Sequence, residues 1–226
     1  MNPISASRKL LAMAGELSRH PREFRYALRW LNSMLPGHSP LHDEVPWITF
    51  RAIDWLATYL QPRMSVFEYG AGGSTLYLAK RVRQVVSVEH DEGFYQFVKD
   101  LTAKQGIRNC ELMLHAPRAC TDATRAFASY QQKYKGLCFE SYVKAIDAYP
   151  DASFDLVLVD GRARLACVER ALSKVKPGGA IMLDNSERAA YAEAGHNLNH
   201  LARTDLAGVS PWNLEVSQTT AWRMPN

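Results

Sequence analysis

Apolar and polar positions divide the chain into helical and strand-like segments. Apolar residues at helical spacing predict helices over residues 5–19 and 21–35, a proline-containing loop at 36–46, and a helix over 47–60. Beyond residue 64, short apolar runs alternate with helical patterns. The predicted strands are 65–68, 84–89, 111–114, 154–160, 180–184, 203–209 and 214–224, and the helices among them are 74–82, 92–105, 139–148, 164–174 and 187–201.

This alternation predicts an α/β fold. Strands joined through helices form right-handed crossovers and a mostly parallel sheet. The run Leu156–Val159 is apolar throughout, which indicates a strand that is buried on both faces. Residues 117–153 are long for one connection, and such insertions at the carboxyl edge of a sheet often build substrate pockets.

A glycine-rich segment follows the first strand of the α/β region. Residues 68–75 read Glu-Tyr-Gly-Ala-Gly-Gly-Ser-Thr, and glycines there permit a sharp turn and close approach of a ligand to main-chain N–H groups. Glu89 ends the next strand, where a carboxylate can accept hydrogen bonds from ribose hydroxyls. The alternative is a helix N-cap turn with a solvent-facing Glu89. Thr75 replaces the third glycine of the dinucleotide fingerprint and disfavours a nicotinamide or flavin enzyme.

Four motifs between residues 65 and 185 resemble those of the class I S-adenosylmethionine-dependent methyltransferases. They are Val66–Thr75, Val88–Asp91, Phe154–Asp160 and Lys174–Asp184, the last with a Lys-Pro-Gly-Gly turn. The resemblance implies a doubly wound, Rossmann-like α/β sheet of seven strands, mostly parallel with an antiparallel last strand, preceded here by the N-terminal helices. It also implies S-adenosylmethionine (SAM) as cofactor.

The resemblance further implies which residues bind the cofactor. Gly70, Ala71 and Gly72 would approach its methionine part, Glu68 would orient that loop or bind the amino group through water, and Glu89 would hold the ribose. The other implied residues are Ser74 and Thr75 of the first motif, His90 beside the adenine, His115 and Ala116 in the adenine-side loop, and Asp160 at the methionine end. A structural hydrogen bond is an equal alternative for His115.

Oxygen-bearing side chains follow two predicted strands. Asp160, Asp184 and Asn185 form a set suited to Mg²⁺, because carboxylate and amide oxygens are ligands of hard cations. The set resembles in part the metal site of the catechol and caffeoyl-coenzyme A O-methyltransferases. The alternative is that residues 184–186 cap the next helix.

One position departs from those O-methyltransferases. They carry a lysine three residues after the first aspartate, and Ala163 stands there in this chain, between Arg162 and Arg164. Arginine is a poor base, but it can clamp a carboxylate or a phosphate. Methyl transfer depends mainly on positioning, to which an enzyme adds deprotonation of the acceptor. Asp160 and Arg162 are therefore the candidate catalytic residues, and the acceptor is expected to be a small, anionic molecule.

Charge separates an N-terminal arm, residues 1–38, from a domain at residues 39–226. The chain has a net charge of +4, and the arm alone holds six basic and two acidic residues. We predict a basic amphipathic helical arm followed by a SAM-dependent methyltransferase domain. The arm could pack on the domain with its arginines in solvent, mediate a homodimer, or make peripheral contact with an acidic membrane surface.

Composition excludes several other classes. No apolar run is long enough to cross a bilayer, and no nucleic-acid-binding module is apparent, so nucleic acid is not an expected partner. The four cysteines lack metal-like spacing and fit a reduced, cytoplasmic compartment. The leading hypothesis is methyl transfer from SAM to oxygen of a small molecule, with or without Mg²⁺. The alternatives are a non-catalytic SAM-binding module docked through the arm, and an oxidoreductase on the same fold.

Overall fold

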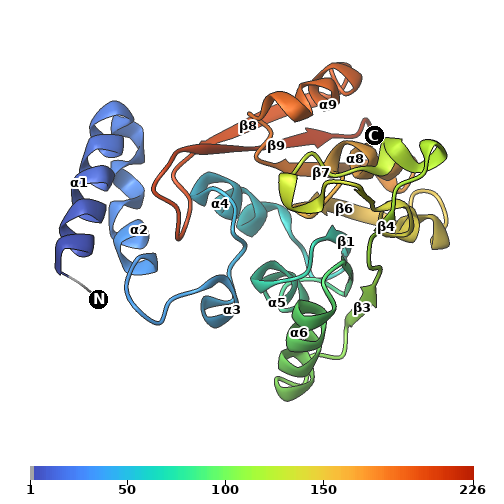
Figure 1. Ribbon diagram of the computed structural model, residues 1–226, viewed down its shortest axis with the longest axis horizontal. Coiled ribbons are helices and arrows are strands. Elements are labelled where there is room, and N and C mark those ends of the chain that lie inside the picture. The colour runs from blue at the N-terminus through green and yellow to red at the C-terminus, as the bar shows by residue number, and fades with distance from the viewer. Residues whose placement is uncertain (1–2) are drawn as a thin grey trace.

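The computed structural model describes the backbone of residues 3–226 and the side chains of residues 11–122, 124 and 126–226. A seven-stranded sheet in the order β3-β2-β1-β6-β7-β9-β8 forms its centre (Figure 1). These strands are β1 (Ser65–Tyr69), β2 (Gln84–Glu89), β3 (Cys110–Leu114), β6 (Phe154–Val159), β7 (Val175–Asp184), β8 (Ala202–Gly208) and β9 (Ser217–Arg223). The pairs from β3 to β7 are parallel, and β9 runs antiparallel to β7 and β8. The predicted fold class is confirmed.

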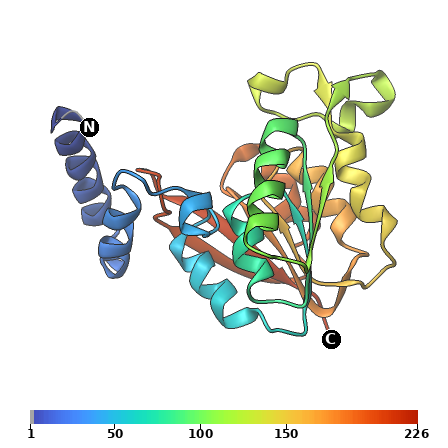
Figure 2. The same cartoon turned by 90° about the horizontal axis from the view of Figure 1, so that it is seen from below.

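Helices cover both faces of this sheet (Figures 1 and 2). They are α1 (Pro3–Arg19), η1 (Pro21–Tyr26), α2 (Ala27–Ser33), α3 (Pro40–Asp43), α4 (Phe50–Tyr59), α5 (Gly73–Ala79), α6 (Glu92–Lys104), α7 (Glu140–Val143), η4 (Lys144–Ala148), α8 (Arg164–Ala171), η5 (Ala189–Tyr191) and α9 (Ala192–Asn197). Successive residues of a strand point to opposite faces of the sheet. Val157 packs in the hydrophobic core formed with α7, α8 and α9. Leu156 packs in the core on the other face, which is formed with α4, α5 and the arm.

Most helices are shorter than the apolar pattern predicts. The helix expected from residue 47 begins at Phe50, because Thr49 caps it by accepting a hydrogen bond from the N–H of Ala52 at 3.2 Å. The segment after Asp184 is a turn that leads to η5, whose N-cap is Arg188 without a side-chain cap. The N-cap interpretation of residues 184–186 is therefore wrong.

The insertion at 117–153 contains a second, two-stranded sheet that the sequence did not predict. Strands β4 (Arg118–Ala119) and β5 (Leu137–Cys138) pair antiparallel, and short 3₁₀ helices η2 (Asp122–Phe127) and η3 (Gln132–Tyr134) lie between them. The pairing brings Cys120 and Cys138 together in a disulfide, with Cα atoms 5.0 Å apart. The expectation of a reduced compartment fits only Cys110 and Cys167, the two free cysteines of the described chain.

The arm packs beside the domain through a small set of buried side chains. Met13, Leu17, Tyr26 and Trp30 join the hydrophobic core on the α4 side of the sheet. Glu23 is 3 % exposed and accepts hydrogen bonds from the guanidinium of Arg51, at 2.8 and 2.6 Å. The charge of this acid is therefore neutralised inside the contact. In the part of the chain that the structure describes, no helix combines the length and apolar character needed to span a bilayer.

Candidate cofactor and acceptor site

The glycine segment forms the turn between β1 and α5 at the carboxyl edge of the sheet. Gly70 has φ +100°, which other residues rarely adopt, and a Cβ there would lie 3.0 Å from the Cα of Gly161. The N–H of Gly70 donates to the carbonyl of Val88 at 2.9 Å. The turn therefore lies against the ends of β2 and β6, on either side of β1. Open α/β sheets bind ligands at such a switch point.

Glu68 and Thr75 hold this turn from inside the protein. The buried carboxylate of Glu68 accepts hydrogen bonds from the hydroxyls of Thr75 at 2.6 Å and Ser87 at 2.7 Å. Thr75 Oγ1 also accepts from the N–H of Gly72 at 2.9 Å. Burial raises the pKa of Glu68 to about 7. Glu68 thus orients the loop, one of the two roles expected of it, and neither Glu68 nor Thr75 borders the cavity described next.

A cavity of about 660 Å³ opens in front of the turn, a volume typical of small-molecule sites. The predicted cofactor residues that line it are Gly70, Ala71, Gly72, Ser74, Glu89, His90 and Asp160. Glu89 accepts hydrogen bonds from the N–H groups of Ala71, His90 and Asp91, at 3.1, 2.8 and 2.9 Å. These contacts fix its carboxylate at the cavity wall, so Glu89 is not a solvent-facing residue.

Gly72 indicates that the cavity accommodates a ligand close to the main chain. Its φ of 168° is an extended conformation that any residue adopts. A Cβ built there would meet nothing nearer than the ring of Phe94, at 3.9 Å. Neither the backbone nor packing therefore requires glycine at this position. A side chain would instead project into the cavity, so the residues of the turn fit a ligand such as SAM, which the resemblance implies.

The two predicted histidines differ in their relation to the cavity. His90 lines it, and its Nε2 lies 2.8 Å from the hydroxyl of Tyr134, which links the insertion to the cofactor side. The N–H of His115 donates to the carbonyl of Glu89 at 2.8 Å. Burial lowers the pKa of His115. Neither the His115 nor the Ala116 side chain lines the cavity, so the structure does not bring this pair to it.

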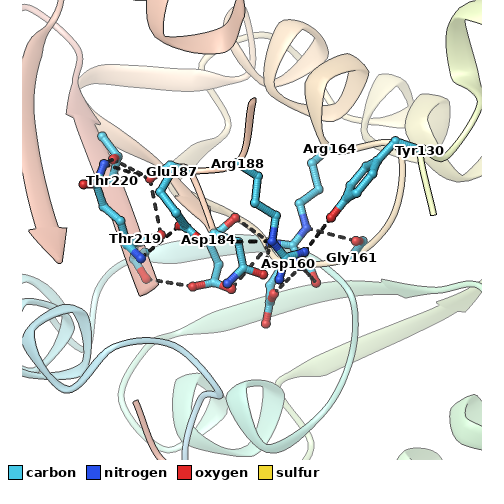
Figure 3. Close-up of polar contacts among 12 residues, drawn as sticks. Tyr130, Asp160, Gly161, Arg164, Asp184, Glu187, Arg188, Thr219 and Thr220 are labelled. Carbon is cyan, nitrogen blue, oxygen red and sulfur yellow. Dashed lines mark hydrogen bonds and ion pairs between the residues drawn. The ribbon is translucent and has the colours of Figure 1, made fainter. Parts of the chain in front are cut away.

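Arg164 lies among the three predicted metal ligands (Figure 3). Its guanidinium donates to Asp160 Oδ1 at 2.8 Å and to the carbonyl of Asp160 at 3.0 Å. It also contacts Asp184 Oδ2 at 3.5 Å and Asn185 Oδ1 at 3.4 Å, and donates to the carbonyls of Gly161 and Asp184. The side chain is 5 % exposed. A cation of the chain itself thus makes the contacts that a divalent metal would make, and the residues do not fit a metal at this point.

Burial and the neighbouring carboxylate of Asp184 raise the pKa of Asp160 well above its usual range, although the charge of Arg164 opposes the shift. Asp184 is fixed on its other side by the hydroxyl of Thr219, which donates to Oδ1 at 2.8 Å. Two carboxylates therefore share one guanidinium. The raised pKa makes the Asp160 carboxylate a stronger proton acceptor than an ordinary aspartate.

A second cavity, of about 380 Å³, adjoins the first, and Asp160, Arg162 and Trp47 border both. The other residues around it are Gln131, Arg164, Asp184, Asn185, Arg188, Ser210, Asn213 and Ser217. The guanidinium of Arg164 already donates hydrogen bonds to Asp160, Gly161 and Asp184. Arg162 lies over the ring of Tyr134, 5.3 Å from its centre, and its buried Nε has no hydrogen-bond partner in the described chain. Arginine side chains thus give this cavity a cationic side.

Several cavity residues were missed by sequence reasoning. Phe94 and Phe97 line the first cavity from the first two turns of α6, and their place just after the Glu89 strand end was the available signal. Trp47 stands at the join of the two cavities, in edge-to-face contact with Trp212 at 6.3 Å. Trp212 and Asn213 belong to the loop that connects β8 and β9. The arm holds this loop, since Trp30 Nε1 donates to the carbonyl of Asn213 at 2.7 Å.

Comparisons with solved structures confirm the fold. The chain is similar to a methyltransferase from Geobacter sulfurreducens, with a TM-score of 0.54 and 13% identity over 88% of this chain and 95% of that one. It is also similar to an rRNA methylase from Streptococcus thermophilus, with a TM-score of 0.52 and 18% identity over 76% and 93%. SMU.1697c from Streptococcus mutans, whose structure is a complex with S-adenosylhomocysteine (SAH), matches with a TM-score of 0.51 and 13% identity over 76% and 94%. No family model and no curated protein matches the chain.

The chain has the fold of the class I SAM-dependent methyltransferases. Its strand order and antiparallel last strand agree with the resemblance found in the motifs. The glycine turn and Glu89 border one cavity at the carboxyl edge of the sheet, where open α/β sheets bind ligands.

Proposed function

We propose that the protein is a methyltransferase that moves the methyl group of SAM to an oxygen atom of a small, anionic acceptor. The observation that carries this proposal is the junction of two cavities at Asp160, Arg162 and Trp47. One cavity is bordered by the glycine turn and Glu89. The other is polar and opens beside it, so a donor and an acceptor can lie next to each other.

The residues at the junction have distinct roles in this reaction. Bound SAM supplies a methyl group on a positively charged sulfur. The glycine turn and Glu89 orient the cofactor, and Trp47 borders both the donor and the acceptor cavity. Asp160, whose pKa is raised, takes the proton from the acceptor hydroxyl as the methyl group is transferred. Arg164 keeps Asp160 in place and supplies the positive charge that a metal ion supplies in related chemistry, so the reaction proceeds without a divalent cation.

Arg162 and Arg188 favour an anionic acceptor. Arg162 borders both cavities, with a guanidinium that is not paired to a carboxylate in the described chain. Arg188 also borders the second cavity, and its guanidinium donates a hydrogen bond to the hydroxyl of Tyr130. A planar guanidinium binds a carboxylate or phosphate through two hydrogen bonds. The second cavity is thus suited to an acceptor that carries one such group.

Calorimetric titration with SAH tests the cofactor site. We expect the wild type to bind SAH and Glu89→Ala to bind it about 10–100-fold more weakly, the range for lost hydrogen bonds to a charged group. Glu193→Ala, in which an exposed glutamate of α9 is removed, is the matched control and should bind as the wild type does. Equal affinity of the Glu89 variant would contradict the assignment.

Product formation separates the proposed enzyme from its alternatives. Release of SAH with a panel of hydroxylated carboxylates and phosphates as acceptors supports methyl transfer. SAH binding without turnover of any acceptor would favour a non-catalytic module. Binding of a nicotinamide dinucleotide in place of SAH would favour the oxidoreductase.

A further inference from the structure

The arm exposes a row of large apolar side chains. Phe24 lies in η1, Leu28 and Leu31 lie in α2, and Leu35 follows the end of α2. They are spaced four, three and four residues apart. Their exposed fractions are 58, 82, 38 and 53 %. Leu11 of α1 is also exposed, at 74 %. We call these five residues the arm stripe.

The arm stripe is not explained by the active site or by the fold. The other large apolar side chains exposed in the described chain are Trp47, Phe94, Phe97 and Tyr130. The first three line the cofactor cavity, and Tyr130 holds Arg188 of the second cavity. The arm stripe therefore has no role in those cavities. Its helices project from the side of the domain, beside the β8–β9 connection (Figures 1 and 2).

Charge around the arm stripe is positive. Between residues 20 and 38, the only acidic residue is Glu23, and it is buried against Arg51. Arg22 and Arg25 of η1 are exposed, and neither forms an ion pair with a described residue; Arg25 lies over the ring of Tyr26. Arg8 and Lys9 add to the charge of the arm, although their side chains lie outside those described.

We propose that the arm stripe docks the protein on an anionic lipid surface, with its apolar side chains in the interface and its arginines at the headgroups. An apolar face flanked by arginine is typical of interfacial helices, and anionic lipids attract the charge. A second copy of the chain fits less well. A stable protein interface takes about 20–30 residues from each side, and pairing two stripes would bring two cationic arms together.

Docking would also orient the catalytic side of the molecule. Trp30 and Ser33 lie on the opposite face of α2 and hold the loop of Trp212 and Asn213, which is next to the second cavity. The membrane-facing and loop-facing sides of one short helix are thus separate. Changes to the arm stripe should therefore leave SAH binding and the fold intact.

Vesicle flotation of the 226-residue protein tests the proposal. The probes are vesicles of phosphatidylcholine alone and vesicles in which about one lipid in three is phosphatidylglycerol. We expect binding to the anionic vesicles only, and loss of binding in about 1 M NaCl, where the screening length is about 3 Å. Equal binding to both vesicles, or binding to neither, would overturn the proposal.

Paired variants separate the two components of the docking. Leu28→Ser with Leu35→Ser should weaken vesicle binding about tenfold or more by removing apolar contact. Arg22→Gln with Arg25→Gln should weaken it about 25-fold, at about fivefold for each charge near an anionic surface. The matched control is Arg63→Gln with Arg108→Gln, two exposed arginines that precede β1 and β3, which should bind as the wild type does.

All variants are first checked for unchanged circular dichroism and SAH affinity. Vesicle binding that survives both arm pairs, or that falls equally in the control pair, contradicts docking through the arm. Sedimentation gives the other decisive outcome. A dimer that the Leu28 and Leu35 substitutions convert to a monomer, together with absence of vesicle binding, would assign the arm stripe to a second copy of the chain.

Discussion

Removal of the Arg164 guanidinium tests the electrostatic account of the site. The Arg164→Met substitution keeps an unbranched side chain and leaves Asp160 and Asp184 without their shared counter-charge. The guanidinium donates to three carbonyl oxygens and contacts side-chain oxygens of Asp160, Asp184 and Asn185, with only 5 % of the side chain exposed. Breaking a buried ion pair by removing one partner costs about 3–5 kcal/mol. For a chain of this length, that loss lowers the melting temperature by about 6–20 °C.

Arg170→Met on the same helix is the matched control. Its side chain is 44% exposed and lies 3.5 Å from Asp147, so its loss should cost no more than about 1 kcal/mol. Thermal unfolding measures both variants. Arg164→Met combined with Asp184→Asn should recover part of the lost stability, because the amide oxygen can still accept the hydrogen bond of Thr219. Equal losses for the two arginine variants, or no recovery in the double variant, would refute the argument.

Divalent cations provide a second measurement on the same site. Arg164→Ala frees the oxygens of Asp160, Asp184 and Asn185, so Mg²⁺ should raise the melting temperature of this variant in a saturable manner. Wild-type protein should show no such rise, and its methyl transfer should persist in excess chelator. Two results would refute the role given to Arg164 and indicate a metal site. One is saturable stabilisation of the wild type by Mg²⁺. The other is methyl transfer that is lost on chelation and restored by Mg²⁺.

Two further predictions concern the buried acid and the insertion. The pKa of Glu68 is raised to about 7 from 4.5, so its stabilising contribution is present at low pH and lost as pH rises through this window. Between about pH 4.5 and 8, the unfolding free energy of the wild type should fall by about 3 kcal/mol more than that of Glu68→Gln in urea titrations; parallel curves would disprove the shift. The Cys120–Cys138 disulfide spans 18 residues, so replacing both cysteines by serine should lower the unfolding free energy by about 3 kcal/mol. A reductant should lower the melting temperature of the wild type but not that of the double-serine variant.

The order of strands and helices could be predicted because it depends on local patterns. Uninterrupted apolar runs such as Leu156–Val159 define buried strands, and the glycine turn fixes where the first strand ends. The cofactor side of the site follows from the same signals, since Glu89 ends β2 and therefore reaches the edge of the sheet beside the turn. The two-residue strands β4 and β5 leave no such pattern. Their pairing depends on contacts between segments separated by the rest of the insertion, so the disulfide was not predicted.

The position of an arginine in the sequence did not show whether it contacts a ligand or binds the neighbouring carboxylates. Arg162 and Arg164 both flank the position of the expected lysine, and either could have contacted a ligand. Ala163 adopts φ +47°, and this turn places Arg164 at the start of α8, beneath the strand ends, while Arg162 stays at the cavities. The consequence is chemical as well as structural. The oxygen-rich set that suggests a metal ion has instead a permanent cation from the chain.

The arm shows most clearly what an apolar pattern does not determine. Phe24, Leu28, Leu31 and Leu35 are the apolar residues that predict a helix over 21–35, yet their side chains are exposed. The buried face holds Trp30 instead, with an indole that fills the contact and donates to the carbonyl of Asn213. Apolar periodicity indicates that a helix has an apolar face, but it does not show which surface covers that face. The second helical segment of the arm carries apolar side chains on two sides, and each side can be covered by a different surface. The domain supplies one of them. The arm stripe is exposed, and we therefore infer that an anionic lipid surface outside the chain covers it.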